Sequence, residues 1–244
     1  MPTRQRIESP FGASGPVGAE RAERAATSAT LALRALTGFE EEHVERHASE
    51  PNTARLCNEI IARCLVAPGE DPGAARTTVR ELLVAERDRE LVALRRLSLG
   101  PHVTALVACP RCGEECEASF SLDVLPLHFD VPERQVLVDV EGVGDVVLRL
   151  PTAGDQEDLF DAGLDGEAER RSWLLARCLE RYGDQSGGFD LRFAHALPVA
   201  VRGALEAALE ERLPDLDLQM AVECSRCGAA ISAPFDVPVF FFSS

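Results

Sequence analysis

Two short segments of the chain carry cysteine pairs with the spacing of a metal-binding turn. The segment ALVACPRCGEECEASF spans residues 105–120, and MAVECSRCGAAISAPF spans residues 220–235. Each contains C-x-x-C-G, a turn that directs two thiols to one side, where glycine avoids the strain of a Cβ atom. One turn supplies two ligands, whereas a structural zinc ion takes four in a tetrahedron. We therefore predict one shared zinc ion with four thiolate ligands: Cys109, Cys112, Cys224 and Cys227.

The same spacing leaves other uses of these cysteines open. Iron binds similar thiolate sets, although zinc is the commoner occupant of structural sites. Two turns without metal are a less favoured alternative. A redox pair is also less favoured, because neither C-x-x-C opens a helix after a strand. Cys116 is predicted not to bind metal, since Ile231 stands at the matching place in the second segment. Three further cysteines are predicted to be buried on helix faces: Cys57, Cys64 and Cys178.

The sequence lacks a recognisable catalytic constellation. His43 and His47 are four residues apart in EEHVERH, a spacing that can bind metal, but Val44 stands where the H-E-x-x-H motif has its glutamate. A solvated helix face is the favoured interpretation, and a metallohydrolase is the least favoured function. Nucleophile-elbow, P-loop and dinucleotide-binding motifs are missing from the sequence. Four thiolates would leave zinc no open position for water, so we expect a protein that is not an enzyme.

The two cysteine segments belong to a longer internal similarity. At an offset of 115 residues, Thr37 aligns with Thr152 and Cys109 aligns with Cys224. At an offset of 114, the sequence Ala-Arg-Cys-Leu at 62–65 recurs at 176–179. Matches in the same order at nearly constant offset indicate two copies of one unit.

Hydrophobic periodicity and capping residues predict the elements that position these turns. In the first copy we expect a short strand at 30–36, a helix after Thr37, a helix at 52–66, a helix over 87–97 that ends at Gly100, and strands at 102–109 and 114–122. A β-hairpin is expected at 134–150. In the second copy we expect a helix after Thr152, helices at 167–182 and 198–213, and a strand over 215–223.

These elements predict an α+β fold in which two pseudo-repeated helical units each end in a zinc-knuckle β-hairpin. The two knuckles are joined in one zinc-ribbon-like metal site. The predicted boundaries are a flexible tail over 1–28, the first repeat over 29–125, a linker and β-hairpin over 126–150, and the second repeat over 151–244. The ending APFDVPVFFFSS is expected to be either a strand that closes over the core or an exposed docking patch.

Charge and hydropathy restrict the partners. The chain has 244 residues and a formal net charge of −16, and all 25 of its basic residues are arginine. A field of this sign opposes binding to nucleic acid or to an anionic membrane surface. The sequence has no apolar run near the roughly 20 residues of a membrane span, and residues 1–28 lack the apolar core of a signal peptide. We therefore expect a cytoplasmic protein.

Several segments taken together carry a family resemblance: ALTGFEEE, NEIIARCLV, LLVAERDRELVALRRLSLGPHVTALVACPRCG, LRLPTAGDQEDL, LLARCLE and LQMAVECSRCGAAISAPFD. Over about residues 30–242 the chain resembles the T4-like phage baseplate hub and hub-assembly chaperone proteins and their zinc-knuckle relatives in contractile injection system clusters. The resemblance implies a non-enzymatic structural or assembly protein of the baseplate of a contractile phage-tail-like particle. Its implied partners are baseplate, hub or spike proteins. The alternative function is a zinc-ribbon module that binds nucleic acid or the transcription machinery.

Overall fold

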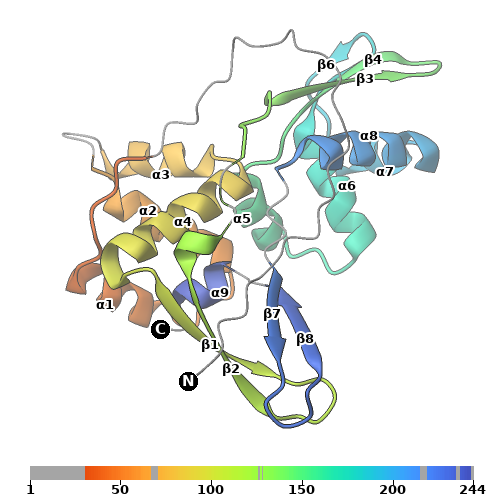
Figure 1. The fold of residues 1–244 in the computed structure, drawn as a ribbon. Coiled ribbons are helices and arrows are strands. Elements are labelled where there is room, and N and C mark those ends of the chain that lie inside the picture. The colour runs from red at the N-terminus through yellow and green to blue at the C-terminus, as the bar shows by residue number, and fades with distance from the viewer. Residues whose placement is uncertain are drawn as a thin grey trace, which may run out of the picture.

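The computed structural model describes residues 31–66, 71–125, 127, 129–214, 219–234 and 237–242 (Figure 1). Its helices are α1 (Gly38–Arg46), α2 (Thr53–Cys64), α3 (Pro72–Arg80), α4 (Val84–Leu99), α5 (Ala153–Asp161), α6 (Glu167–Cys178), α7 (Leu191–Ala196), α8 (Val199–Arg212) and α9 (Val237–Phe242). Its strands are β1 (His102–Ala108), β2 (Glu115–Ser121), β3 (Gln135–Val140), β4 (Gly144–Arg149), β5 (Leu179–Tyr182), β6 (Gln185–Ser186), β7 (Gln219–Glu223) and β8 (Ala230–Pro234). The predicted mixture of helices and short strands is confirmed.

The first half of the chain forms a helical core. Helix α2 buries Leu56, Ile60, Ile61 and Cys64, which follow the helical period and therefore lie on one face. This face packs against α4, whose Leu91 and its neighbours join the same core. Helix α4 ends at the predicted Gly100, which has φ 85° and so adopts a backbone conformation that favours glycine.

The second half has a separate core between helices and a sheet. Strands β3, β4, β5 and β6 pair in that order, and the inner side chains of β3 and β4 meet α6 and α8. The buried residues of this core include Val136, Val146, Leu148, Leu175 and Leu205. None of the helices in the described part of the chain is long and apolar enough to span a bilayer.

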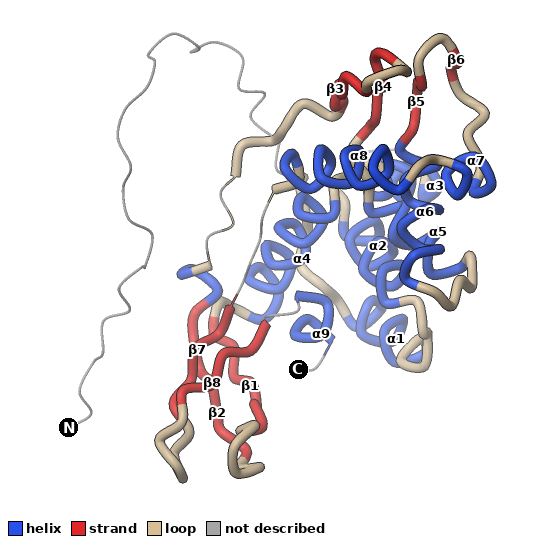
Figure 2. Tube along the Cα trace, turned by 90° about the vertical axis from the view of Figure 1, so that its right-hand side faces the viewer, coloured by secondary structure: helices blue, strands red, loops and turns tan. Residues whose placement is uncertain are grey.

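Two hairpins project away from the helices (Figures 1 and 2). Strands β1 and β2 form one antiparallel pair, and β7 and β8 form the other, and β2 lies beside β7. Each hairpin is a separate two-stranded sheet among the described residues. An isolated two-stranded hairpin is only marginally stable in water, and the first of these hairpins is supported by Val103 of β1, which is buried in the core of the first half.

The C-terminal segment adopts a conformation that differs from the expected strand. Residues 237–242 form the short helix α9, which lies against α4 and α2. Val237 and Phe241 are four residues apart, so they share one helix face, and both are buried in the core of the first half. The interpretation as a strand is therefore wrong, whereas burial of this segment in a core is confirmed for these two side chains.

Three other local predictions need correction or completion. The strand expected at 30–36 is wrong for the described residues, where Leu33 makes only an isolated bridge with Leu65. The helix expected at 167–182 ends at Cys178, because pairing with β4 draws residues 179–182 into β5. The sequence interpretation also missed the helices α3 and α7. Residues 215–218 of the strand expected at 215–223 lie outside the described residues.

Matching local contacts occur in the two halves of the chain. Thr37 donates its backbone N–H and its hydroxyl to Glu40, at 3.0 and 2.7 Å, and Arg34 binds the same carboxylate with both terminal nitrogens. In the second half Thr152 donates in the same two ways to Asp155, at 2.9 and 3.1 Å. Arg149 binds Asp155 in the same bidentate manner.

The helix that carries Ala-Arg-Cys-Leu contributes to the same arrangement in each half. Its arginine also approaches the capping carboxylate, at 3.8 Å for Arg63 and Glu40 and at 3.4 Å for Arg177 and Asp155. Leu65, directly after α2, bridges to Leu33. In the second half the leucine after α6 pairs with Leu148 in the same way.

Candidate metal centre

The two C-x-x-C-G segments fold into the same turn at the tips of the two hairpins. In the first turn the N–H of Cys109 donates to the carbonyl of Glu114 at 2.8 Å, and the N–H of Gly113 donates to the carbonyl of Cys109 at 2.9 Å. In the second turn Cys224 and Gly228 repeat this pattern, with both distances at 2.9 Å. The two glycines have φ 73° and 66°, so a residue with a Cβ atom would be strained there.

The tertiary structure brings the four predicted ligands together. All four sulfur atoms lie within 4.8 Å of one another. The Sγ atoms of Cys109 and Cys227 are 3.7 Å apart, and those of Cys112 and Cys224 are 3.6 Å apart. A tetrahedral zinc ion with Zn–S bonds of about 2.3 Å requires sulfurs about 3.8 Å apart. The geometry of the four thiols therefore fits a tetrahedral metal site.

The ionisation of the thiols also favours a bound cation. Backbone N–H groups of Cys227 and Arg226 donate to the sulfur of Cys224 and lower its pKa to about 6. The pKa of Cys112 is lowered by the amide of Glu114, but burial and the other three thiols outweigh this and raise it to about 12. Four adjacent thiolates repel one another unless a cation neutralises them, so a divalent metal would displace the protons that remain.

The residues around the centre shield it and tie the two hairpins together. Cys109 and Cys224 are almost completely buried, and Cys112 and Cys227 are half-buried. Cys116 and Ile231 are buried at matching places behind the four sulfurs. Cys116 is not a member of the four-sulfur cluster, in agreement with the sequence prediction. Across the two turns, Arg226 forms an ion pair with Glu114 at 3.3 Å.

The remaining cysteines lie in the helical cores, as predicted. Cys57, Cys64 and Cys178 are each fully buried. Burial raises the pKa of Cys64 to about 11 and that of Cys178 to about 12. Thiols of this kind stay protonated at neutral pH and behave as small apolar side chains.

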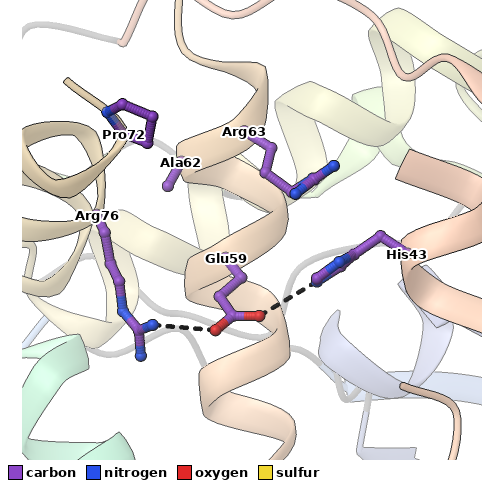
Figure 3. Close-up of a pocket in the computed structure, with 6 residues that line it drawn as sticks. All are labelled: His43, Glu59, Ala62, Arg63, Pro72 and Arg76. Atoms are coloured by element: carbon purple, nitrogen blue, oxygen red, sulfur yellow. Dashed lines mark hydrogen bonds and ion pairs between the residues drawn. The ribbon is translucent and has the colours of Figure 1, made fainter. Parts of the chain in front are cut away.

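His43 lines a separate pocket (Figure 3), and His47, the second histidine considered as a metal ligand, contacts His43. Nε2 of His43 is 3.2 Å from Glu59, and Arg76 approaches the same carboxylate at 3.1 Å from the opposite side. His47 donates from Nδ1 to the carbonyl of His43 at 2.7 Å, and the two rings are tilted by 35° with their centroids 4.2 Å apart. Among the described residues, no cluster of three or more candidate ligand side chains includes either histidine.

Sequence reasoning missed a buried carboxylate that joins the two halves. Glu157 on α5 is 3% exposed and accepts hydrogen bonds from Arg76 and Arg80 on α3, both at 2.6 Å, and from Asn58 on α2 at 3.0 Å. In the sequence, Glu157 lies in GDQEDL and is indistinguishable from a solvated helix residue. Beside this junction a cleft of about 700 Å³ is lined by arginines of both halves, among them Arg80, Arg134, Arg149 and Arg177.

Comparisons with known proteins give one match. A family model described as T4 bacteriophage base plate protein matches residues 20–242 of the chain. No curated protein and no solved structure matches it.

Proposed function

The chain belongs to the family of T4 bacteriophage base plate proteins, and we propose that it is a non-enzymatic structural or assembly protein of the base plate of a contractile phage-tail-like particle. The family match over residues 20–242 is the observation that carries this proposal. This proposal has two forms: the protein either acts as a chaperone during assembly or remains in the finished particle. Hub, spike or other base plate proteins are the proposed partners.

The metal centre fits a structural role. We propose that Cys109, Cys112, Cys224 and Cys227 hold one zinc ion. Four protein thiolates complete the tetrahedron and leave no position for a substrate or an activated water. Zinc at this place would join two hairpins that have few other contacts, so its binding energy would contribute directly to folding.

The matching contacts in the two halves support an origin by duplication. In each half an arginine, a capping threonine and an acidic residue form the same set of hydrogen bonds, with the acidic residues Glu40 and Asp155 at the offset of 115 residues. The alignment also places Cys109 on Cys224. A duplicated unit with one half-site per copy explains why the ligands are divided two and two.

Deleting the gene in the phage or the producing cell tests the proposed function. We expect tails that lack base plates in electron micrographs, with recovery on expression of the wild-type chain. The Cys109→Ser/Cys224→Ser chain should fail to restore base plates. If the deletion strain makes normal numbers of functional particles, the proposal is wrong.

Composition of the purified particles separates the two forms of the proposal. A structural protein should be present in washed particles at constant stoichiometry with the other base plate proteins. An assembly protein should bind base plate proteins in cell extracts and be missing from the particles.

A further inference from the structure

The guanidinium of Arg95 on α4 is buried without a hydrogen-bond partner. The residue is 9% exposed, and its Nε and Nη1 atoms are covered yet donate to no acceptor. Nη2 makes no hydrogen bond to the described residues either, but it is not covered, so solvent reaches it. Burial lowers the pKa of Arg95, and no neighbouring carboxylate opposes this effect. A buried charge that lacks a counter-ion destabilises a folded chain, so the structure leaves a place for an anion here.

Two acidic residues in this region bind other arginines of α4. Asp88 shares a helix face with Arg95 but lies two turns earlier, and Nε of Arg87 donates to it at 2.7 Å. Arg96, the residue directly after Arg95, forms an ion pair with Asp123. These carboxylates are therefore already neutralised by a neighbouring guanidinium, and neither of them compensates the charge of Arg95.

Arg95 lies at the border between the first core and the surface. Leu91, one turn earlier on the same helix face, is buried in the core that also contains Phe241 of α9. Leu99, one turn later on that face, is 53% exposed. A protein surface that covered Leu99 would therefore also reach the open Nη2 atom of Arg95.

We propose that the guanidinium of Arg95 binds a carboxylate side chain of a base plate partner, an inference that rests on the function proposed above. A guanidinium binds a carboxylate through two parallel N–H···O bonds, and Nη2 with an adjacent N–H of the same group can form this fork. The partner's carboxylate supplies the missing acceptors and the missing negative charge. The net charge of −16 opposes a nucleic-acid phosphate as the source of the anion.

Thermal unfolding of the free chain with Arg95→Met tests whether the arginine lacks an internal partner. Methionine keeps an apolar stem and removes the charge, so the melting temperature should rise by about 2–4 °C. Arg171→Met is the matched control, because Arg171 is 56% exposed on α6 and pairs only loosely with Glu167, at 3.8 Å. The control should change the melting temperature by less than about 2 °C. A melting temperature of Arg95→Met at or below that of wild type would mean that the chain itself stabilises this charge, and would overturn the proposal.

Affinity for the base plate proteins that the wild-type chain binds in cell extracts tests the docking role. With each such protein purified, Arg95→Met should raise the dissociation constant about thirty-fold or more, whereas Arg171→Met should leave it unchanged. Arg95→Lys should restore the affinity only in part, because an ammonium group cannot form the fork.

Three results would overturn the proposal. Equal affinities of wild type and Arg95→Met for the same base plate protein would exclude this inference alone. A wild-type chain that binds no base plate protein would exclude the proposed function and this inference with it. Millimolar phosphate that raises the melting temperature of wild type but not of Arg95→Met would identify a free anion as the occupant instead of a partner's carboxylate.

Discussion

The junction between the two halves contains a buried carboxylate, and replacing Glu157 by glutamine should destabilise the whole chain. The side chain of Glu157 is 3% exposed and contacts Arg76 and Arg80 at 2.6 Å. Breaking a buried ion pair costs about 3–5 kcal/mol. The two arginines are 41% and 27% exposed and can recover some hydration, so we expect a loss of about 2–3 kcal/mol in the free energy of unfolding.

Urea unfolding at pH 7 with saturating metal measures this loss. Glu42→Gln is the matched control, because Glu42 precedes Glu157 by 115 residues, is 59% exposed and pairs with the equally exposed Arg46. An exposed pair of this kind contributes little, so the control should stay within about 0.5 kcal/mol of wild type. A Glu157→Gln protein as stable as the control would refute the importance of the buried carboxylate.

The difference in unfolding free energy between wild type and Glu157→Gln should depend on pH. Burial opposes ionisation of Glu157, but Asn58, Arg76 and Arg80 outweigh it and hold its pKa below the usual range. When folding lowers the pKa of a carboxylate, its ionised form stabilises the protein at pH values above the pKa of the unfolded chain, which is about 4.3 for glutamate. This contribution is lost as the pH falls through the folded pKa. The difference between wild type and Glu157→Gln should therefore narrow in acid, and a constant difference would contradict the ion-pair explanation.

Four further predictions concern the metal, the packing and the partners. Cys224→Ser should lose the bound zinc and much of the stability, whereas Cys116→Ile should keep one zinc per chain by elemental analysis; metal retained in Cys224→Ser would exclude the shared site. Gly154→Ala should destabilise the chain by about 1–3 kcal/mol, since the new Cβ would lie 3.0 Å from the backbone oxygen of Arg80; a gain in melting temperature would contradict this contact. Phe241→Ala should cost roughly 3 kcal/mol, because this side chain is buried in the first core; an unchanged unfolding midpoint would mean that α9 is dispensable. Filter binding should detect no association with duplex or single-stranded DNA at physiological salt, and tight binding that weakens steeply with added salt would favour the nucleic-acid alternative.

The paired cysteine turns and the helix caps were predictable because each depends on residues close in sequence. In C-x-x-C-G the turn and its glycine orient Cys109 and Cys112 within five residues, whatever the rest of the chain does. The caps at Thr37 and Thr152 likewise use an acidic residue three positions later. The internal similarity then indicated that the second turn would complete the first.

Only the tertiary structure decided the conformation of residues 179–182 and 237–242 and the burial of Glu157. Residues 237–242 have the composition of a strand, but they form a helix against α4 and α2, with Val237 and Phe241 buried in the first core. Residues 179–182 continue a helical pattern, yet the neighbouring β4 takes them into a sheet. Glu157 became buried because Asn58 and the arginines of α3, many positions earlier in the chain, fold against it. Local pattern cannot report such contacts, because the partners that satisfy or bury a group lie far away in the sequence.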